Sequence, residues 1–502
     1  KIYTPSFTEK FNTNSKKHEL LTTAWKSVVY PCKIIWKSVV LHRKIIWKSV
    51  NIMLFRKIEK DITDHLQSKD DRIMILEGAR QIGKSFIIRE VGSKLFTNFI
   101  EINFVKDDEG AQMFKSIGTT EEFYFTLSSS FGEKLDKYEN TLIFLDEIQQ
   151  YPQYLTLLKF FREDHRFRFI ASGSLLGITL RETTSIPIGS IIRKNMYQLD
   201  FEEFLLANGF GQEALSTLRT RLLSRESLDE SIHNYIMNLF RRYLLVGGLP
   251  AAVNEYLDSH NIMKVRDVQE SIHNLYEVDA TKYEKDSSKT LLIRRIYNMI
   301  PSQLENKKKR VVVKNIQNKI GDRFDNYREE FEYLISSGTA LEVSAISNPK
   351  YPLAESAQKN LIKLYLNDVG LLTLLLYKNN IRPVISDEDS VNLGSVYESV
   401  VAQELKAHGH KLFYYDNKQR GEVDFLIDDY SHTTTLPIEV KSGKDYTRHC
   451  ALNNLLKVKD YNITSGLVLS NSREIKTDSG ITYMPIYYVM FLNANEVEDV
   501  YF

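Results

Sequence analysis

Short apolar runs recur through the first half of the chain and alternate with helical patterns. Two of them, at residues 73–76 and 141–145, are expected to be buried strands, and two further strands are expected at 98–104 and 167–172. Apolar residues at helical spacing follow the first run at 86–90 and precede the last at Leu155, Leu158 and Phe161. Strands that alternate with helices predict an open parallel sheet of the α/β class.

The pattern becomes helical from residue 212 to about 285 and is broken by Gly247-Gly248-Leu249-Pro250. Further helices are expected over 291–304, 313–320 and 327–337, and a strand over 340–344. Three helices followed by a β-wing fit a winged helix, a variant of the helix-turn-helix. The helices before them would form a lid over the first domain's site.

A second α/β pattern occupies the C-terminal third. A helix is expected from Gly394 through His408, and strands over 411–415, 422–427 and 436–441. We expect a leader outside the fold (1–52), an α/β domain (53–210), a helical and winged-helix region (211–350) and a second α/β domain (351–502). Three folded domains suit the length at roughly 150 residues each.

A phosphate-binding pattern follows the first strand. Gly78-Ala79-Arg80-Gln81-Ile82-Gly83-Lys84-Ser85 stands between that strand and its helix, the setting that a P-loop requires. Its backbone N–H groups would curl around phosphates at a helix N-terminus. Lys84 would reach the β- and γ-phosphates, and the Ser85 hydroxyl would be a ligand of Mg²⁺. All eight residues are therefore predicted to bind ATP with Mg²⁺.

Polar residues follow the third and fourth strands. Asp146 would hold Mg²⁺, and Glu147 would orient or deprotonate the attacking water. Ser174 or Ser172, at the tip of the fourth strand, would sense the γ-phosphate. Arg181 and Arg193 are the candidates for an arginine that contacts this phosphate, and the sequence does not choose between them.

Five motifs occur in order along the chain. They are the P-loop, Phe144-Leu145-Asp146-Glu147-Ile148-Gln149, Ala171-Ser172-Gly173-Ser174, Leu199-Asp200-Phe201-Glu202-Glu203-Phe204-Leu205 and Tyr243-Leu244-Leu245-Val246-Gly247-Gly248-Leu249-Pro250. This series resembles the prokaryotic AAA-type ATPases that carry a C-terminal domain of unknown function. The resemblance runs from about Met53 to the C-terminus. It implies an AAA+ P-loop NTPase domain, then helical and winged-helix segments, then a nuclease-like domain.

The C-terminal third holds a second candidate site. Asp424 and Glu439, on neighbouring expected strands, can bind one divalent cation, and Glu398 could complete the site. Lys441 faces the same side as Glu439 and would stabilise a hydroxide or the developing phosphate charge. The order resembles the PD-(D/E)XK nucleases, with Glu439-Val440-Lys441 as (D/E)-x-K and Val423-Asp424 in place of Pro-Asp. It implies a restriction-endonuclease-like fold, and both cleavage and a catalytically silent binding domain stay open.

Composition excludes several classes of protein. Hydrophobic residues make up 43% and charged residues 26%, which excludes a disordered or collagenous chain. Cys32 and Cys450 are the two cysteines, which favours a reducing cytoplasm over a disulfide-rich secreted protein. No apolar run approaches the roughly twenty residues of a membrane span, so no membrane partner is expected. The histidines His408, His410 and His449 are expected at the surface.

The first fifty residues differ from the rest. Lys-Ile-Ile-Trp-Lys-Ser-Val occurs at 33–39 and again at 44–50. A helical supercoil, a membrane-surface element and a translated tandem repeat upstream of Met53 are the alternatives, and Pro31 and the β-branched residues count against the first. We favour the translated repeat. Residues 1–52 carry ten Lys and Arg against two Asp and Glu, which leaves 56 basic and 63 acidic residues beyond them.

This acidic body weakens the case for broad electrostatic binding of nucleic acid. Contact with DNA or RNA would come from local patches in the C-terminal half, such as Lys307-Lys308-Lys309-Arg310, unless that run is a solvated loop. The first hypothesis is therefore an ATPase coupled to a nuclease-like domain that acts on nucleic acid. The second is a nucleotide-gated sensing or docking protein with a silent nuclease-like domain. A homo-oligomer that transduces a signal is a third.

Overall fold

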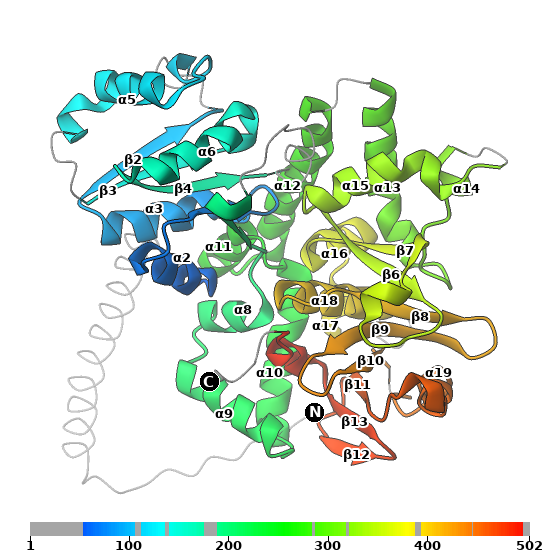
Figure 1. Cartoon of the computed structure of the whole chain (residues 1–502). Coiled ribbons are helices and arrows are strands. Elements are labelled where there is room, and N and C mark those ends of the chain that lie inside the picture. Colours follow the sequence, from blue (N-terminus) through cyan, green and yellow to red (C-terminus); the bar gives the residue numbers. More distant parts are fainter. Residues whose placement is uncertain are drawn as a thin grey trace, which may run out of the picture. The chain divides into compact units, whose positions relative to one another are not determined.

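The computed structural model (Figure 1) describes residues 54–105, 112–135, 140–174, 188–283, 287–317, 321–386, 393–443 and 445–494. The chain divides into two compact units, Lys1–Leu54 and Phe55–Phe502. The expected leader and Arg181 lie outside the described residues. The fold of the second unit is built around two sheets.

The first sheet has five parallel strands in the order β2-β3-β4-β1-β5, which confirms the predicted α/β sheet. They are β1 (Ile73–Glu77), β2 (Asn98–Asn103), β3 (Thr141–Asp146), β4 (Arg168–Gly173) and β5 (Ile191–Asn195). The sequence pattern did not predict β5, because only its first two residues are apolar and only Ile191 is buried at this edge of the sheet. β4 lies between β1 and β3, so the ends of these three strands adjoin.

Helices α2 (Ile58–Gln67), α3 (Lys84–Leu95), α5 (Thr120–Leu135) and α6 (Gln153–Asp164) accompany this sheet. Aromatic side chains make up much of the hydrophobic core between this sheet and helices α5 and α6. The ring of Phe161 lies 4.5 Å from that of Phe123 and stacks on that of Phe169 at 4.8 Å. Burying one such side chain stabilises the fold by roughly 1.5–3 kcal/mol.

A helical region follows the first sheet. It consists of α8 (Phe201–Ala207), α9 (Gln212–Leu223), α10 (Glu230–Val246), α11 (Pro250–Ser259), α12 (Ile262–Tyr283), α13 (Ser287–Leu304), α14 (Lys314–Gln317) and α15 (Arg328–Ser336). Asp200 caps α8 with a capping box in which Glu203 is the reciprocal partner. No helix within the described ranges is long and apolar enough to cross a bilayer.

The second sheet has eight strands in the order β12-β13-β11-β10-β9-β8-β6-β7. They are β6 (Ala340–Ile346), β7 (Gln358–Leu366), β8 (Phe413–Asn417), β9 (Gly421–Asp429), β10 (Thr434–Lys441), β11 (Gly466–Ser470), β12 (Lys476–Asp478) and β13 (Ile481–Pro485). The strand expected as a wing is β6, which pairs with β7 and with β8. One sheet therefore contains strands from both sides of residue 350.

Helices α16 (Val369–Tyr377), α17 (Arg382–Ser386), α18 (Gly394–Ala407) and α19 (Cys450–Leu456) belong to this C-terminal part. Every residue of α18 from Ser395 to Leu405 is buried. This helix contacts β10 and also the C-terminal short helix at Ile486–Phe491. A helix buried on all sides has to satisfy its polar side chains through partners on other elements.

Candidate functional site

The loop between β1 and α3 has the backbone that its sequence predicts. Gly78 and Gly83 have φ angles of 144° and 94°, a region that favours glycine. A Cβ atom on Gly78 would also overlap the carbonyl oxygen of Met196. Gln81 adopts a φ of 64° between them. The loop therefore turns tightly into the N-terminus of α3, which is the geometry of a phosphate-binding loop.

Lys84, the first residue of α3, is folded back onto this loop. Its Nζ donates to the carbonyl oxygens of Gly78 and Ala79 at 2.9 Å and 2.7 Å. Burial lowers the pKa of Lys84 to about 8, against the opposing attraction of Glu147 and Asp146. An anionic ligand in the loop would restore the favourable environment that burial removes from the ammonium.

Three side chains donate hydrogen bonds to Asp146 at the end of β3. Ser85 Oγ lies 2.9 Å from each carboxylate oxygen, and Asn103 Nδ2 lies 2.7 Å from Oδ2. Ser172 Oγ also donates to Oδ1. Burial raises the pKa of Asp146, and the hydrogen bonds from Ser172 and Ser85 oppose that rise. Asn103 was not among the sequence candidates, although it ends a strand at the same edge of the sheet.

Glu147 is held by a second set of contacts. It adopts a left-handed backbone with φ 59° and ψ 45° directly after the strand. Gln149 Nε2 donates to its Oε2, Ser174 Oγ does so at 3.4 Å, and Arg80 Nη2 lies 4.0 Å from the same oxygen. The two candidate serines thus divide, with Ser172 on Asp146 and Ser174 on Glu147. The role of Gln149 was not foreseen from the sequence.

The structure does not place Arg193 beside the carboxylates of Asp146 and Glu147. Arg193 lies on β5 and pairs with Glu77 on β1, with Nη2 2.6 Å from Oε2. Those two strands are neighbours in the sheet, so the ion pair joins them side by side. Of the two arginine candidates, Arg181 lies outside the described residues and Arg193 is engaged on an adjacent strand.

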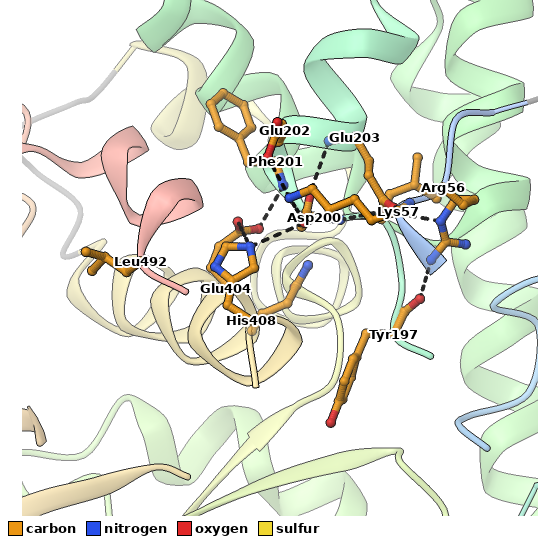
Figure 2. A network of polar contacts seen from close by, with 12 residues as sticks. Arg56, Lys57, Tyr197, Asp200, Phe201, Glu202, Glu203, Glu404, His408 and Leu492 are labelled. Atoms are coloured by element: carbon orange, nitrogen blue, oxygen red, sulfur yellow. Dashed lines mark hydrogen bonds and ion pairs between the residues drawn. The ribbon is translucent and has the colours of Figure 1, made fainter. Parts of the chain in front are cut away.

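A buried charge network joins the P-loop to α18 (Figure 2). Arg56 donates through Nη1 to the Ile82 carbonyl at 2.9 Å and through Nε to Glu203 at 3.1 Å. Asp200, beside Glu203 in the capping box, lies 3.3 Å from His408 Nε2. Glu404 accepts a hydrogen bond from the Phe201 backbone N–H at 2.9 Å. The beginning of α8 is therefore fixed both to the P-loop side and to α18.

The expectation that three histidines lie at the surface is wrong. His408, His410 and His449 are all buried, with exposed fractions of 8%, 7% and 4%. His410 Nε2 lies 3.1 Å from the Leu492 carbonyl, and His449 Nε2 lies 2.7 Å from the Tyr483 hydroxyl. Each ring contacts a partner from an element far away in the sequence, which a local pattern cannot reveal.

The C-terminal candidates come from three elements. Glu398 lies on α18, Asp424 on β9, and Glu439 and Lys441 on β10. Asp424 precedes the paired residues Phe425 and Ile438, and its Oδ2 accepts the Val440 N–H at 2.8 Å. Lys441 Nζ donates to Glu439 Oε1 at 2.7 Å. The fold thus gathers the four predicted residues around one end of β9 and β10.

Burial and mutual repulsion shape the charges of this cluster. Burial raises the pKa of Asp424 well above its ordinary value, and Glu398 and Glu439 raise it further. Burial also raises the pKa of Glu439, whereas Lys441 lowers it. The carboxylates therefore lie close enough together that the negative charge of one disfavours ionisation of the next.

Lysines outside the predicted set neutralise part of this charge. Lys309, from the basic run, pairs with Glu398, and Tyr365 donates to the other oxygen of Glu398 at 3.1 Å. Lys363 on β7 is fully buried, with Nζ 2.5 Å from Glu422 Oε1. The run Lys307-Lys308-Lys309-Arg310 is therefore not a loop with all of its charges in solvent.

The oxygen donors of this cluster suit a hard divalent cation. Among the described residues, no three His, Cys, Asp or Glu side chains form a ready metal site. Mg²⁺, however, commonly takes only one or two protein carboxylates and completes its shell with water and substrate phosphate. Asp424 and Glu439 supply two, and Glu439 Oε2 is buried with no hydrogen-bond partner in the described part of the chain. The donor set therefore fits a cation that is shared with a ligand.

Three family models match successive parts of the chain. Residues 70–205 match the AAA domain, residues 237–382 match a domain of unknown function (DUF8612), and residues 393–489 match a further domain of unknown function (DUF4143). No curated protein matches the chain.

Several solved structures are similar to parts of the chain. The Walker-type ATPase of Pyrococcus abyssi is 16% identical, with a TM-score of 0.39 over 64% of this chain and 96% of that one. The RuvB Holliday junction branch migration motor of Thermotoga maritima is 14% identical, with a TM-score of 0.27 over 57% and 89%. The Hsp104–ADP complex of S. cerevisiae is 10% identical, with a TM-score of 0.28 over 72% and 43%.

The matched AAA domain spans the parallel sheet and the loop of residues 78–85, so the family match and the observed fold indicate the same kind of domain. Residues 70–205 of the chain therefore form an AAA domain, with the parallel sheet and glycine loop of a P-loop fold.

Proposed function

We propose that the protein binds and hydrolyses ATP with Mg²⁺ at the P-loop and couples this reaction to a C-terminal nuclease-like domain that acts on nucleic acid. The convergence on Asp146 carries the ATPase part. Ser85 from the P-loop helix, Asn103 from β2 and Ser172 from β4 all donate to this carboxylate. Lys84 lies close enough to interact with the charges of both Asp146 and Glu147, so phosphate, cation and water would meet there.

Each residue has a role that follows from its position. The backbone N–H groups of residues 78–85 and the Lys84 ammonium would bind the phosphates. The Ser85 hydroxyl and the Asp146 carboxylate would hold Mg²⁺, which supplies charge neutralisation on the phosphates. Glu147 would orient the attacking water and accept its proton. Ser174, 3.4 Å from Glu147, would place a hydroxyl near the γ-phosphate.

ATP turnover tests this assignment. Lys84→Ala should abolish nucleotide binding or turnover, and Glu147→Gln should retain binding while turnover falls by at least about a hundredfold. Lys94→Ala is the matched control, because Lys94 is a half-exposed lysine near the end of the same helix. Turnover by Lys84→Ala at the wild-type rate would contradict the proposal.

For the C-terminal domain, the proposal concerns both a nuclease-like fold and a metal-dependent reaction. Helix α18 with Glu398, strand β9 with Asp424 and strand β10 with Glu439 and Lys441 follow the order of a PD-(D/E)XK nuclease. Asp424 and Glu439 would hold a divalent cation, which would polarise a nucleic-acid phosphate. Lys441, 2.7 Å from Glu439, would stabilise the attacking hydroxide or the developing negative charge.

One observation favours a second candidate function. Glu398 pairs with Lys309, Glu439 with Lys441 and Glu422 with Lys363. A cluster in which three of the four carboxylates already pair with lysines can serve as a structural core. In that case the domain would be a silent nuclease-like module that docks a protein partner under the control of nucleotide.

Cleavage assays separate the two candidates. DNA and RNA are incubated with Mg²⁺, with and without ATP, and the wild type is compared with Asp424→Ala and Lys441→Ala. Cleavage that both variants lose supports the nuclease. Absence of cleavage by intact protein, or cleavage that both variants keep, supports the docking function.

The proposal extends to the oligomeric state of the protein and to its cellular compartment. We propose a homo-oligomer in the cytoplasm, where a free thiol stays reduced. Cys450 is such a thiol and is exposed at the start of α19. Light scattering with and without ATP measures the assembly.

A further inference from the structure

We propose that Asp279 of α12 is a positioning residue for ATP hydrolysis, because it holds Arg80 of the P-loop away from a close ion pair with Glu147. The inference rests on the proposed function, in which Glu147 acts on the attacking water. It adds to the ATP site a residue that lies more than seventy positions beyond the matched AAA domain.

Arg80 lies between two carboxylates. Its Nε is 3.0 Å from Asp279 Oδ2, whereas its Nη2 is 4.0 Å from Glu147 Oε2. The three side chains are 15%, 8% and 20% exposed, so solvent screens these charges only in part. The shorter contact is the one with Asp279, and the guanidinium is therefore drawn toward α12 and away from Glu147.

The same helix also holds the P-loop backbone. The hydroxyl of Tyr276 donates to the carbonyl oxygen of Arg80 at 2.8 Å. Tyr276 and Asp279 are three residues apart, so they share one face of α12. One residue of the loop is thus contacted at both its carbonyl and its guanidinium by a single helical face.

A second contact covers the neighbouring residue of the loop. Gly338, at the end of the α15–β6 turn, has a φ of 72°, and a Cβ atom placed on it would lie 3.0 Å from the Ala79 nitrogen. Both α12 and this turn lie within residues 237–382, the region matched by the domain of unknown function. The P-loop is therefore packed directly against a region outside the AAA domain.

The charge arrangement predicts the effect of removing Asp279. Without that carboxylate, the attraction of Glu147 would draw Arg80 toward it. A close Arg80–Glu147 pair would hold the Glu147 carboxylate away from the water. Lys84 and the N–H groups of the loop would still bind the phosphates, so the loss should fall on kcat and leave KM nearly unchanged.

A double-mutant cycle on ATP turnover tests the inference. Asp279→Asn should lower kcat by at least about fivefold with KM within about twofold of wild type. Asp279→Glu, which keeps the charge, should recover most of kcat. In the Asp279→Asn background, Arg80→Gln should raise kcat back to that of the Arg80→Gln single variant, because the misplaced guanidinium is gone.

Glu277→Gln is the matched control. Glu277 lies on the same helix but contacts Arg294 and Asn298 of α13, so its kcat should equal that of the wild type. Additive losses in the double variant, or an unchanged kcat in Asp279→Asn, would overturn the inference while the wild type remains active. An inactive wild type would overturn the proposed function as well, so the two failures are distinguishable.

Discussion

Ser85 Oγ donates to both carboxylate oxygens of Asp146 at 2.9 Å, although the residues are 61 positions apart. The contact exists because β1 and β3 run parallel on either side of β4 and end at the same edge. It joins the start of α3 to the end of β3, the two places from which a P-loop protein holds its cation.

Removing the Ser85 hydroxyl should therefore weaken the use of Mg²⁺. Ser85→Ala is expected to lower the apparent Mg²⁺ affinity in ATP turnover by at least about tenfold, because one oxygen ligand is lost. The measurement is a Mg²⁺ titration at fixed ATP. Ser93→Ala, at an exposed position of the same helix, should titrate like the wild type. Identical curves for both variants would argue against Ser85 as a ligand.

The Gly247-Gly248 turn should not tolerate a side chain. The Gly248 N–H donates to Asp368 Oδ2 at 2.7 Å, and a Cβ on Gly248 would overlap the Leu199 carbonyl oxygen. Gly248→Ala should cost about 3 kcal/mol of unfolding free energy, because the backbone must shift. Urea denaturation measures this cost. Gly132→Ala, which meets no atom within 4 Å, should stay within about 1 kcal/mol of the wild type.

Asp368 should make stability depend on pH between about 4 and 6. Burial raises its pKa to about 6, against hydrogen bonds from the Gly248 and Leu371 N–H groups that lower it. The folded state therefore binds the proton more tightly than the unfolded state, whose carboxyl has a pKa near 3.9. This contribution to stability is complete below pH 4 and is lost as the pH rises through 6. The loss amounts to about 3 kcal/mol.

Asp368→Asn isolates that contribution. The difference in unfolding free energy between the wild type and this variant should shift by about 2 kcal/mol between pH 4 and pH 7, in favour of the variant at the higher pH. Urea midpoints across this range provide the measurement. A difference that does not change with pH would show that Asp368 does not titrate in this window.

The pair between fully buried Lys363 and partly exposed Glu422 should be costly to break at the lysine. Lys363 Nζ lies 2.5 Å from Glu422 Oε1 and 4.5 Å from the centre of the Tyr414 ring. Lys363→Met should cost about 3 kcal/mol, because the nearby carboxylates of Glu398 and Asp424, as well as Glu422, would lose a positive charge. Adding Glu422→Gln should recover part of this loss. Thermal and urea denaturation of both variants test the pair, and a fully additive double variant would contradict it.

The first domain could be predicted from the sequence because its signals are local. Strands β1 and β3 contain continuous apolar runs, β2 and β4 contain shorter apolar segments, and the P-loop residues are consecutive. β5 was not predicted because it has only two apolar residues, and its Arg193 pairs with Glu77 at the edge of the sheet. Asn103 and Gln149 also escaped, because neither contributes to a linear motif.

The C-terminal cluster shows the same division. The order of Glu398, Asp424, Glu439 and Lys441 indicated one site, and the fold gathers these residues around β9 and β10. Their lysine partners were not predictable in this way. Lys309 and Lys363 reach the cluster from a turn and from β7, far away in the chain.

The amino-acid sequence alone was enough to identify the phosphate-binding loop, the acidic end of β3 and the alternation of strands and helices that builds a parallel sheet. These features depend on residues within one turn or one strand, where spacing alone dictates geometry. The tertiary structure decided which polar groups meet. It placed Asp279 beside Arg80, divided Ser172 and Ser174 between two carboxylates, and buried α18. Strand order and helix packing arise from contacts between segments that are distant in the sequence, and a local sequence pattern does not predict such contacts.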